Sequence, residues 1–135
     1  MMTIFSRIVK GEIPCHKIAE TDDCFAFLDI QPLATGHILV IPKLEVDYIF
    51  DVADDIYAKL WQFAKRVSIA QQHAIACKRI GIAVIGLEVP HAHIHLIPLN
   101  TVNDINFSLP KMNPTPDELS KTAELIRSFF NMNWK

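Results

Sequence analysis

The sequence is poor in glycine and cysteine, has no long hydrophobic run and carries little net charge. Its 135 residues include four glycines and three cysteines, and the formal net charge is -2 at pH 7. The longest uncharged apolar stretch, Ile80 to Leu87, is far shorter than the about 20 residues that a membrane-spanning helix needs. A charge this close to zero provides no basic surface for nucleic acid or anionic lipid. We therefore expect a protein that binds neither membranes nor nucleic acids.

The cysteines do not form a recognisable disulfide or metal-binding pattern. Cys15, Cys24 and Cys77 are odd in number and widely spaced, with no Cys-x-x-Cys pair. A chain of this length with 50% hydrophobic residues can bury a core without disulfides, so we expect three reduced thiols in a single domain spanning residues 1–135. The first residues show no basic flank followed by an apolar core, which predicts a cytoplasmic protein.

Hydrophobic periodicity predicts an α+β fold. Apolar residues recur at steps of three and four from Asp54 to Cys77, as on one face of a helix. A second helix is expected to open at Thr115, followed by Pro116 and by Glu118 as the third position of a capping box. A short helical turn is expected at Phe5–Val9. Five strands are expected at His16–Glu20, Cys24–Ile30, His37–Ile41, Ile80–Leu87 and Val89–Leu99. These elements predict an antiparallel sheet of about five strands, with the long helix and the C-terminal helix packed on it.

Three of the six histidines lie at alternate positions within five residues. In a strand, His91, His93 and His95 would share one face, and the apolar residues between them would share the other. Three interpretations are possible: a polar strand face without chemistry, a zinc site, or covalent and acid/base catalysis on an anionic substrate. Three residues on one straight strand span roughly 13 Å, which is too far for one tetrahedral ion. We therefore favour catalysis.

The sequence resembles the histidine triad (HIT) family of nucleotide hydrolases and transferases, named for a His-x-His-x-His motif. Three blocks between residues 4 and 98 carry the resemblance: IFSRIVKGEIP, AFLDIQPLATGHILVIPK and GLEVPHAHIHLIP. The small nucleotide-binding phosphoramidases and their bacterial relatives are the most similar branch. Residues 100–135 match no block and are expected to form an extension that contains the last helix.

The resemblance implies specific roles for the histidines. His93 would attack the α-phosphate of a nucleoside monophosphate derivative, a phosphoramidate or dinucleoside polyphosphate, and form a nucleotidyl-histidine that water hydrolyses. The backbone carbonyl of His91 would orient His93, while His95 and His37 would bind phosphate oxygens or pass a proton to the leaving group. Eight further residues would hold the purine nucleotide, with Asp29 accepting from the ribose hydroxyls: Ile4, Phe5, Ile8, Phe27, Asp29, Ile30, Gly86 and Glu88.

The resemblance also implies a homodimer that needs no cofactor. Two alternatives stay open: a nucleotide-binding module without turnover, and a metal-dependent hydrolase with His37, His93 and His95 as ligands. The sequence departs from the family at Ile80, where many members have asparagine, and at Glu88, where many have a hydroxyl residue. Some bacterial members bind zinc at three positions that are replaced together here, which predicts that no metal is bound there: Thr3, Ser6 and Glu45.

Overall fold

Five antiparallel strands form one sheet in the computed structural model, which describes residues 2–133. Their order across the sheet is β1-β2-β3-β5-β4, so that the last two strands in sequence exchange places. The bounds are β1 (Lys17–Glu20), β2 (Cys24–Leu28), β3 (Ile38–Pro42), β4 (Arg79–Ala83) and β5 (Ile94–Leu99). The predicted fold class is confirmed.

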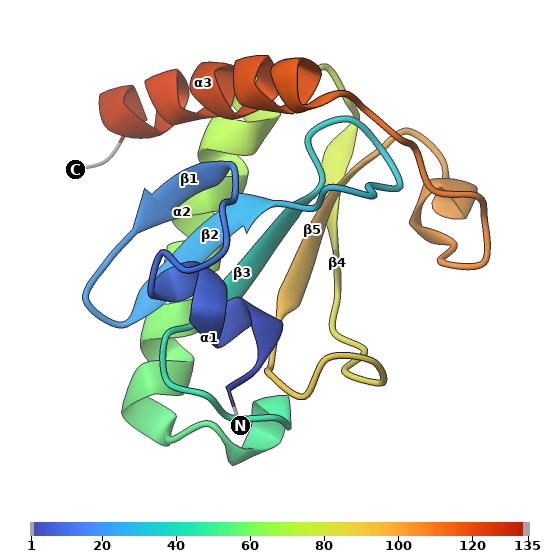
Figure 1. Cartoon of the computed structure of the whole chain (residues 1–135). Helices are drawn as coiled ribbons and strands as arrows, with labels where there is room; N and C mark the ends of the chain where they lie inside the picture. The colour runs from blue at the N-terminus through green and yellow to red at the C-terminus, as the bar shows by residue number, and fades with distance from the viewer. Residues whose placement is uncertain (1, 134–135) are drawn as a thin grey trace.

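Helices cover both faces of this sheet. Figure 1 shows α2 running behind the sheet, α3 crossing one end of it, and the short α1 in front. The helices are α1 (Ile4–Val9), α2 (Asp54–Ala74) and α3 (Pro116–Asn133), with two short 3-10 helices, η1 (Ile49–Asp51) and η2 (Val102–Ile105). None of the helices in residues 2–133 is long and apolar enough to cross a membrane.

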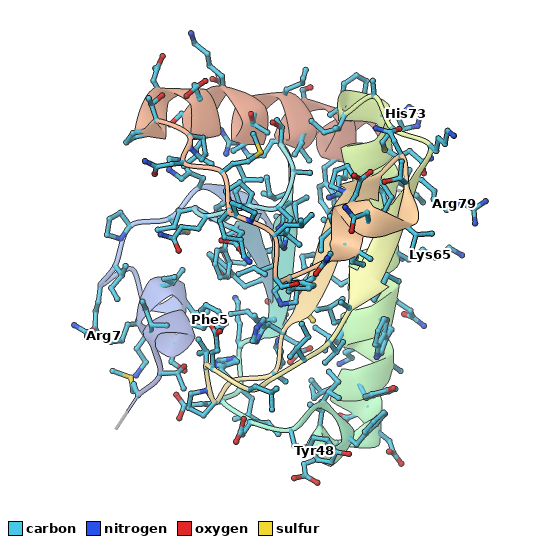
Figure 2. All side chains as sticks on the ribbon, turned by 90° about the vertical axis from the view of Figure 1, so that its right-hand side faces the viewer. Phe5, Arg7, Tyr48, Lys65, His73 and Arg79 are labelled. Carbon is cyan, nitrogen blue, oxygen red and sulfur yellow. The ribbon has the colours of Figure 1, made fainter. Side chains whose placement is uncertain are left out.

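Alternating residues of the strands supply two separate apolar clusters. On β2, Ala26 and Leu28 belong to the main core with α2 and α3, whereas Phe25 and Phe27 pack in a smaller cluster with Phe5 of α1. Figure 2 shows Phe5 pointing from α1 toward the sheet. Strands β2 and β3 are therefore buried on both faces, and the smaller cluster lies on the α1 face.

The start of α3 follows the capping pattern predicted from the sequence. The Thr115 hydroxyl accepts from the Glu118 N–H at 3.1 Å, and the Glu118 carboxylate accepts from the Thr115 N–H at 2.9 Å. Each side chain satisfies a backbone donor that the first helical turn leaves unpaired. The last predicted helix is thus confirmed at its first residue, Pro116.

The prediction of one strand from Val89 to Leu99 is wrong for its first half. Strand β5 begins only at Ile94, so His91 and His93 precede the strand and only His95 lies in it. Pro90 has no N–H to donate to a ladder, and the Ala92 N–H donates to the carbonyl of Val46 at 2.7 Å, outside the strands. The chain bends before His91, where the His91 N–H donates to the Val89 carbonyl at 2.8 Å, so the segment does not continue the strand. Its histidines therefore lie in three different environments.

Candidate active site

The middle histidine has one ring nitrogen engaged and one available. His93 Nδ1 lies 2.8 Å from the carbonyl oxygen of His91, and a carbonyl can only accept, so Nδ1 carries the ring proton. In neutral His93 the lone pair is then on Nε2, for which no partner is found among residues 2–133. Phe5 packs edge-on against the ring, with centroids 5.1 Å apart. His93 is thus held in one tautomer with a nucleophilic nitrogen free.

The first histidine, by contrast, is fully buried and bonded at both ring nitrogens. Nε2 of His91 donates to the carbonyl of Pro42 at 2.8 Å, so Nδ1 accepts from the hydroxyl of Thr3, also at 2.8 Å. Burial lowers the pKa of His91 and keeps the ring neutral. These two bonds fix the ring, and with it the carbonyl that orients His93.

The Thr3 hydroxyl is itself held by a small polar cluster at the start of α1. It accepts from the N–H of Ser6 at 3.1 Å, and the Ser6 hydroxyl donates to the Glu45 carboxylate at 2.7 Å. Glu45 also accepts from the Thr3 N–H at 2.8 Å. These donors lower the pKa of Glu45. Positions interpreted from the sequence only as lost zinc ligands therefore form a hydrogen-bonded support for His91.

His95, the last histidine of the motif, is oriented by a hydrogen bond from His37. The N–H of Leu33 donates to His37 Nδ1 at 3.1 Å, which leaves the proton of neutral His37 on Nε2. His37 Nε2 lies 3.0 Å from His95 Nδ1 and donates to it, so neutral His95 carries its proton on Nε2. Both nitrogens of His37 are engaged inside the protein. His95 is therefore the member of the pair that has a donor to spare for a phosphate oxygen.

Burial keeps this pair uncharged at neutral pH. His37 is 1% exposed and His95 is 8% exposed. Desolvation, followed by repulsion from His95 and Lys111, lowers the pKa of His37 to about 3, and desolvation followed by repulsion from His93 lowers that of His95 to about 4. The two neutral rings continue a chain of hydrogen bonds from Leu33 through His37 to His95. They contribute no positive charge to the site.

A cavity of about 310 Å³ lies in front of His93 and His95. Five residues predicted for the site line it together: Asp29, Gly86, Glu88, His93 and His95. Burial raises the pKa of Asp29, whose carboxylate accepts from the Gln31 N–H at 2.9 Å. The cavity thus combines two histidines with two carboxyl groups. His91 and His37 lie behind it and do not line it.

The predicted apolar walls for the base are placed differently. Phe5 and Phe27 are buried in the smaller apolar cluster, with Ile8 partly buried against it. Ile4 and Ile30 are exposed. None of the five lines the 310 Å³ cavity. Of these five, Phe5 contacts the rings of His91 and His93 from the side of the smaller apolar cluster.

Ile80 and Glu88, where the sequence departs from the family pattern, lie in different parts of the structure. Ile80 lies on β4 opposite Pro98, packs against the main core and does not line the 310 Å³ cavity. Glu88 is exposed and does line it. Only Glu88 therefore bears directly on what this cavity accepts.

Six residues that line the cavity were not predicted from the sequence, and two of them lie beyond residue 100, where no family block is matched. Phe107 and Lys111 come from the segment that follows η2, and the Phe107 ring lies edge-on to His95 with centroids 4.8 Å apart. The Met112 N–H donates to the Pro32 carbonyl at 2.9 Å, which ties this segment to the loop between β2 and β3. No periodicity or motif marks Phe107 or Lys111 in the sequence.

The donor sets do not fit a resident metal. Asp29, His37 and His95 have ligand atoms within 4.8 Å of one another. If His37 Nε2 bound a metal, the ring proton would move to Nδ1 and face the N–H of Leu33. At the other end, the Thr3–Ser6–Glu45 cluster offers two hydroxyls that are already engaged in hydrogen bonds. We continue to expect a reaction without a metal.

Comparisons with known proteins match this chain over most of its length. The family model described as HIT domain matches residues 10–102. Adenosine 5'-monophosphoramidase hnt1 of Schizosaccharomyces pombe is 35% identical over 131 residues, covering 95% of this chain and 98% of that protein. The enzyme of the same name from Saccharomyces cerevisiae is 40% identical over 96 residues, covering 70% of this chain and 61% of that protein.

A solved structure has the same architecture. The Hit-like protein of Bartonella henselae superposes with a TM-score of 0.82 at 26% sequence identity. The match covers 94% of this chain and 95% of that one, so it includes the C-terminal helix as well as the sheet. Sequence and fold thus point to the same group of proteins.

Proposed function

The chain belongs to the HIT domain family, and on this basis we propose that it is an adenosine 5'-phosphoramidase that works through a nucleotidyl-histidine on His93. The observation that carries the proposal is the hydrogen bond from His93 Nδ1 to the His91 carbonyl. It leaves Nε2 available as a nucleophile on a ring that lines the cavity. The phosphoramidase names of the relatives support the choice of substrate.

The proposed reaction has two displacements at phosphorus. First, His93 Nε2 bonds to the α-phosphorus while the bond to the leaving nitrogen breaks, and that nitrogen takes a proton from solvent and departs as an amine. Nδ1 keeps its proton, and the His91 carbonyl stabilises the positive charge on the ring. Water then attacks phosphorus, loses a proton and releases AMP from the regenerated imidazole.

The remaining groups assist by hydrogen bonding. His95 would donate from Nε2 to a phosphoryl oxygen in the transition state, because His37 occupies its Nδ1. His37 is then a positioning residue, which refines the expectation that it contacts phosphate. Asp29, on the rim of the cavity, would accept from the ribose hydroxyls.

We propose a homodimer that pairs through β4 and α2. Strand β4 is an edge of the sheet, and Ile82 on it is 53% exposed. Trp61 of α2 is partly exposed and lines a cavity together with Val84 and Ile85, which follow β4. A second copy would cover this surface. Light scattering at micromolar concentration should give twice the chain mass of 15.3 kDa, and a monomer would contradict the proposal. The cytoplasmic location remains a prediction.

Hydrolysis of a chiral adenosine 5'-phosphoramidothioate in isotopically labelled water tests the mechanism. Two displacements predict release of the nucleotide with retained configuration at phosphorus. Direct attack by water would give inversion and would exclude the covalent step. Binding of AMP without turnover of any phosphoramidate would favour the non-catalytic module instead.

A further inference from the structure

Residues 29–95 supply no lysine or arginine to the 310 Å³ cavity that His93 and His95 line. Its acidic side chains are Asp29 and Glu88. The histidines of the His37–His95 pair are neutral because they are buried. A nucleoside phosphate brings at least one further negative charge to the same space. Binding it there requires a cation, since an uncompensated phosphate beside two carboxyl groups is repelled.

Lys111 is the one cationic side chain among the described residues that line this cavity. Its ammonium donates to the carbonyl of Phe107 at 2.7 Å and makes a longer contact of 3.4 Å with that of Leu109. An ammonium has three N–H donors, so one stays free for a ligand. The Met112–Pro32 hydrogen bond and the contact of Phe107 with His95 anchor the segment on both sides of the lysine.

The positive charge of Lys111 affects the protonation of three residues of the candidate site. It stabilises the ionised form of Asp29 and disfavours protonation of both His37 and His95. Lys111 lies outside residues 10–102, which the family model matches, so the assignment rests on the structure of this chain. Lys111 and His95 line the same cavity, so a phosphate that accepts from His95 would lie in the space that this positive charge faces.

We infer that Lys111 is the phosphate-binding cation of this site and that the segment from Phe107 to Met112 holds it at the cavity. The inference rests on the proposed function, which supplies the nucleotide. It adds that the site selects ligands by their phosphate charge: adenosine binds without help from Lys111, whereas AMP depends on it.

Calorimetric titration of the full-length protein with AMP and with adenosine tests this assignment. Lys111→Gln removes the charge but keeps an N–H donor for the Phe107 carbonyl, so the segment keeps its anchor. AMP should bind about tenfold more weakly to this variant, the loss typical of one charged hydrogen bond. Adenosine affinity should not change, and Lys111→Arg should restore most of the AMP affinity.

The matched control is Lys59→Gln, which makes the same charge change at an exposed residue of α2 that pairs with Asp23 and does not line the cavity. Equal AMP affinity in Lys111→Gln and Lys59→Gln would overturn the inference. A parallel loss of adenosine affinity would also overturn it, since the lysine would then act through the shape of the site. If the wild type showed no turnover but its AMP binding still depended on Lys111, the proposed catalysis would be wrong and the inference about Lys111 would stand.

Discussion

His91 and His93 lie two residues apart, yet their rings are held in opposite ways. The His91 ring is closed: both nitrogens are bonded and none of its surface is exposed. The His93 ring is open: one nitrogen is bonded and the other is available beside a cavity. Within one motif, His91 can therefore serve as a structural support while His93 keeps a nitrogen available for reaction. The number of occupied ring nitrogens separates the two roles.

The largest effect should come from His93→Ala. Removing the open ring removes the nucleophile, so turnover of an adenosine phosphoramidate should fall by more than a thousandfold. AMP affinity and the unfolding free energy should change little by comparison. Steady-state kinetics and denaturant unfolding measure both quantities. Retention of more than about a tenth of wild-type turnover, a barrier change below ~1.4 kcal/mol, would break the comparison.

His95→Ala should have the next largest effect, a loss of about 100 to 1000-fold in turnover, typical of one oriented donor. His37→Ala should be milder, because it leaves the His95 donor in place and removes only its orientation. Single-turnover rates at saturating substrate measure the two variants side by side. A larger loss in His37→Ala than in His95→Ala would show that His37 acts on the substrate itself.

The closed ring should matter more for stability than for rate. Thr3→Val replaces the hydroxyl that pairs with buried His91 Nδ1, which should lower the unfolding free energy by about 1–3 kcal/mol. Turnover should fall only severalfold, and Thr3→Ser should recover both quantities. Urea unfolding and kinetics on the three proteins provide the test. A Thr3→Val protein of wild-type stability would mean that His91 is not held as the structure shows.

The buried His37–His95 pair should also make stability depend on pH. His37 and His95 have folded pKa values of about 3 and about 4, below the ordinary 6.5. Between pH 6.5 and the folded pKa of each ring, the unfolded chain binds a proton that the folded chain does not. Stability is therefore present above pH 6.5 and falls as the pH drops toward 4, by about 1.4 kcal/mol per pH unit for each group. Urea titrations from pH 7 to 4.5 should show this slope, and His37→Gln should reduce it.

Local sequence patterns predicted the elements that depend on neighbours in sequence. The apolar steps of α2 and the Thr115–Glu118 cap of α3 are such features, and both are found in the structure. The start of β5 was missed, because it depends on Ala92 bonding to Val46, far away along the chain. Periodicity alone extends a strand through any alternating segment, whether or not it has a partner.

The same division applies to the candidate site. The histidine spacing predicted the segment that the proposed mechanism uses, but the difference between open and closed rings depends on long-range contacts. Thr3 and His91 are 88 residues apart. Phe107 and Lys111 lie in irregular chain, where only the folded structure shows what they approach. Such contacts leave no periodic signal in a single sequence.

Mass spectrometry of enzyme quenched in alkali during a single turnover of an adenosine phosphoramidate tests the central claim most directly. Fragment ions can locate an attached AMP within the segment that contains all three histidines. The open ring predicts AMP on His93. AMP on His91 or on His95 would contradict the division of roles between the rings.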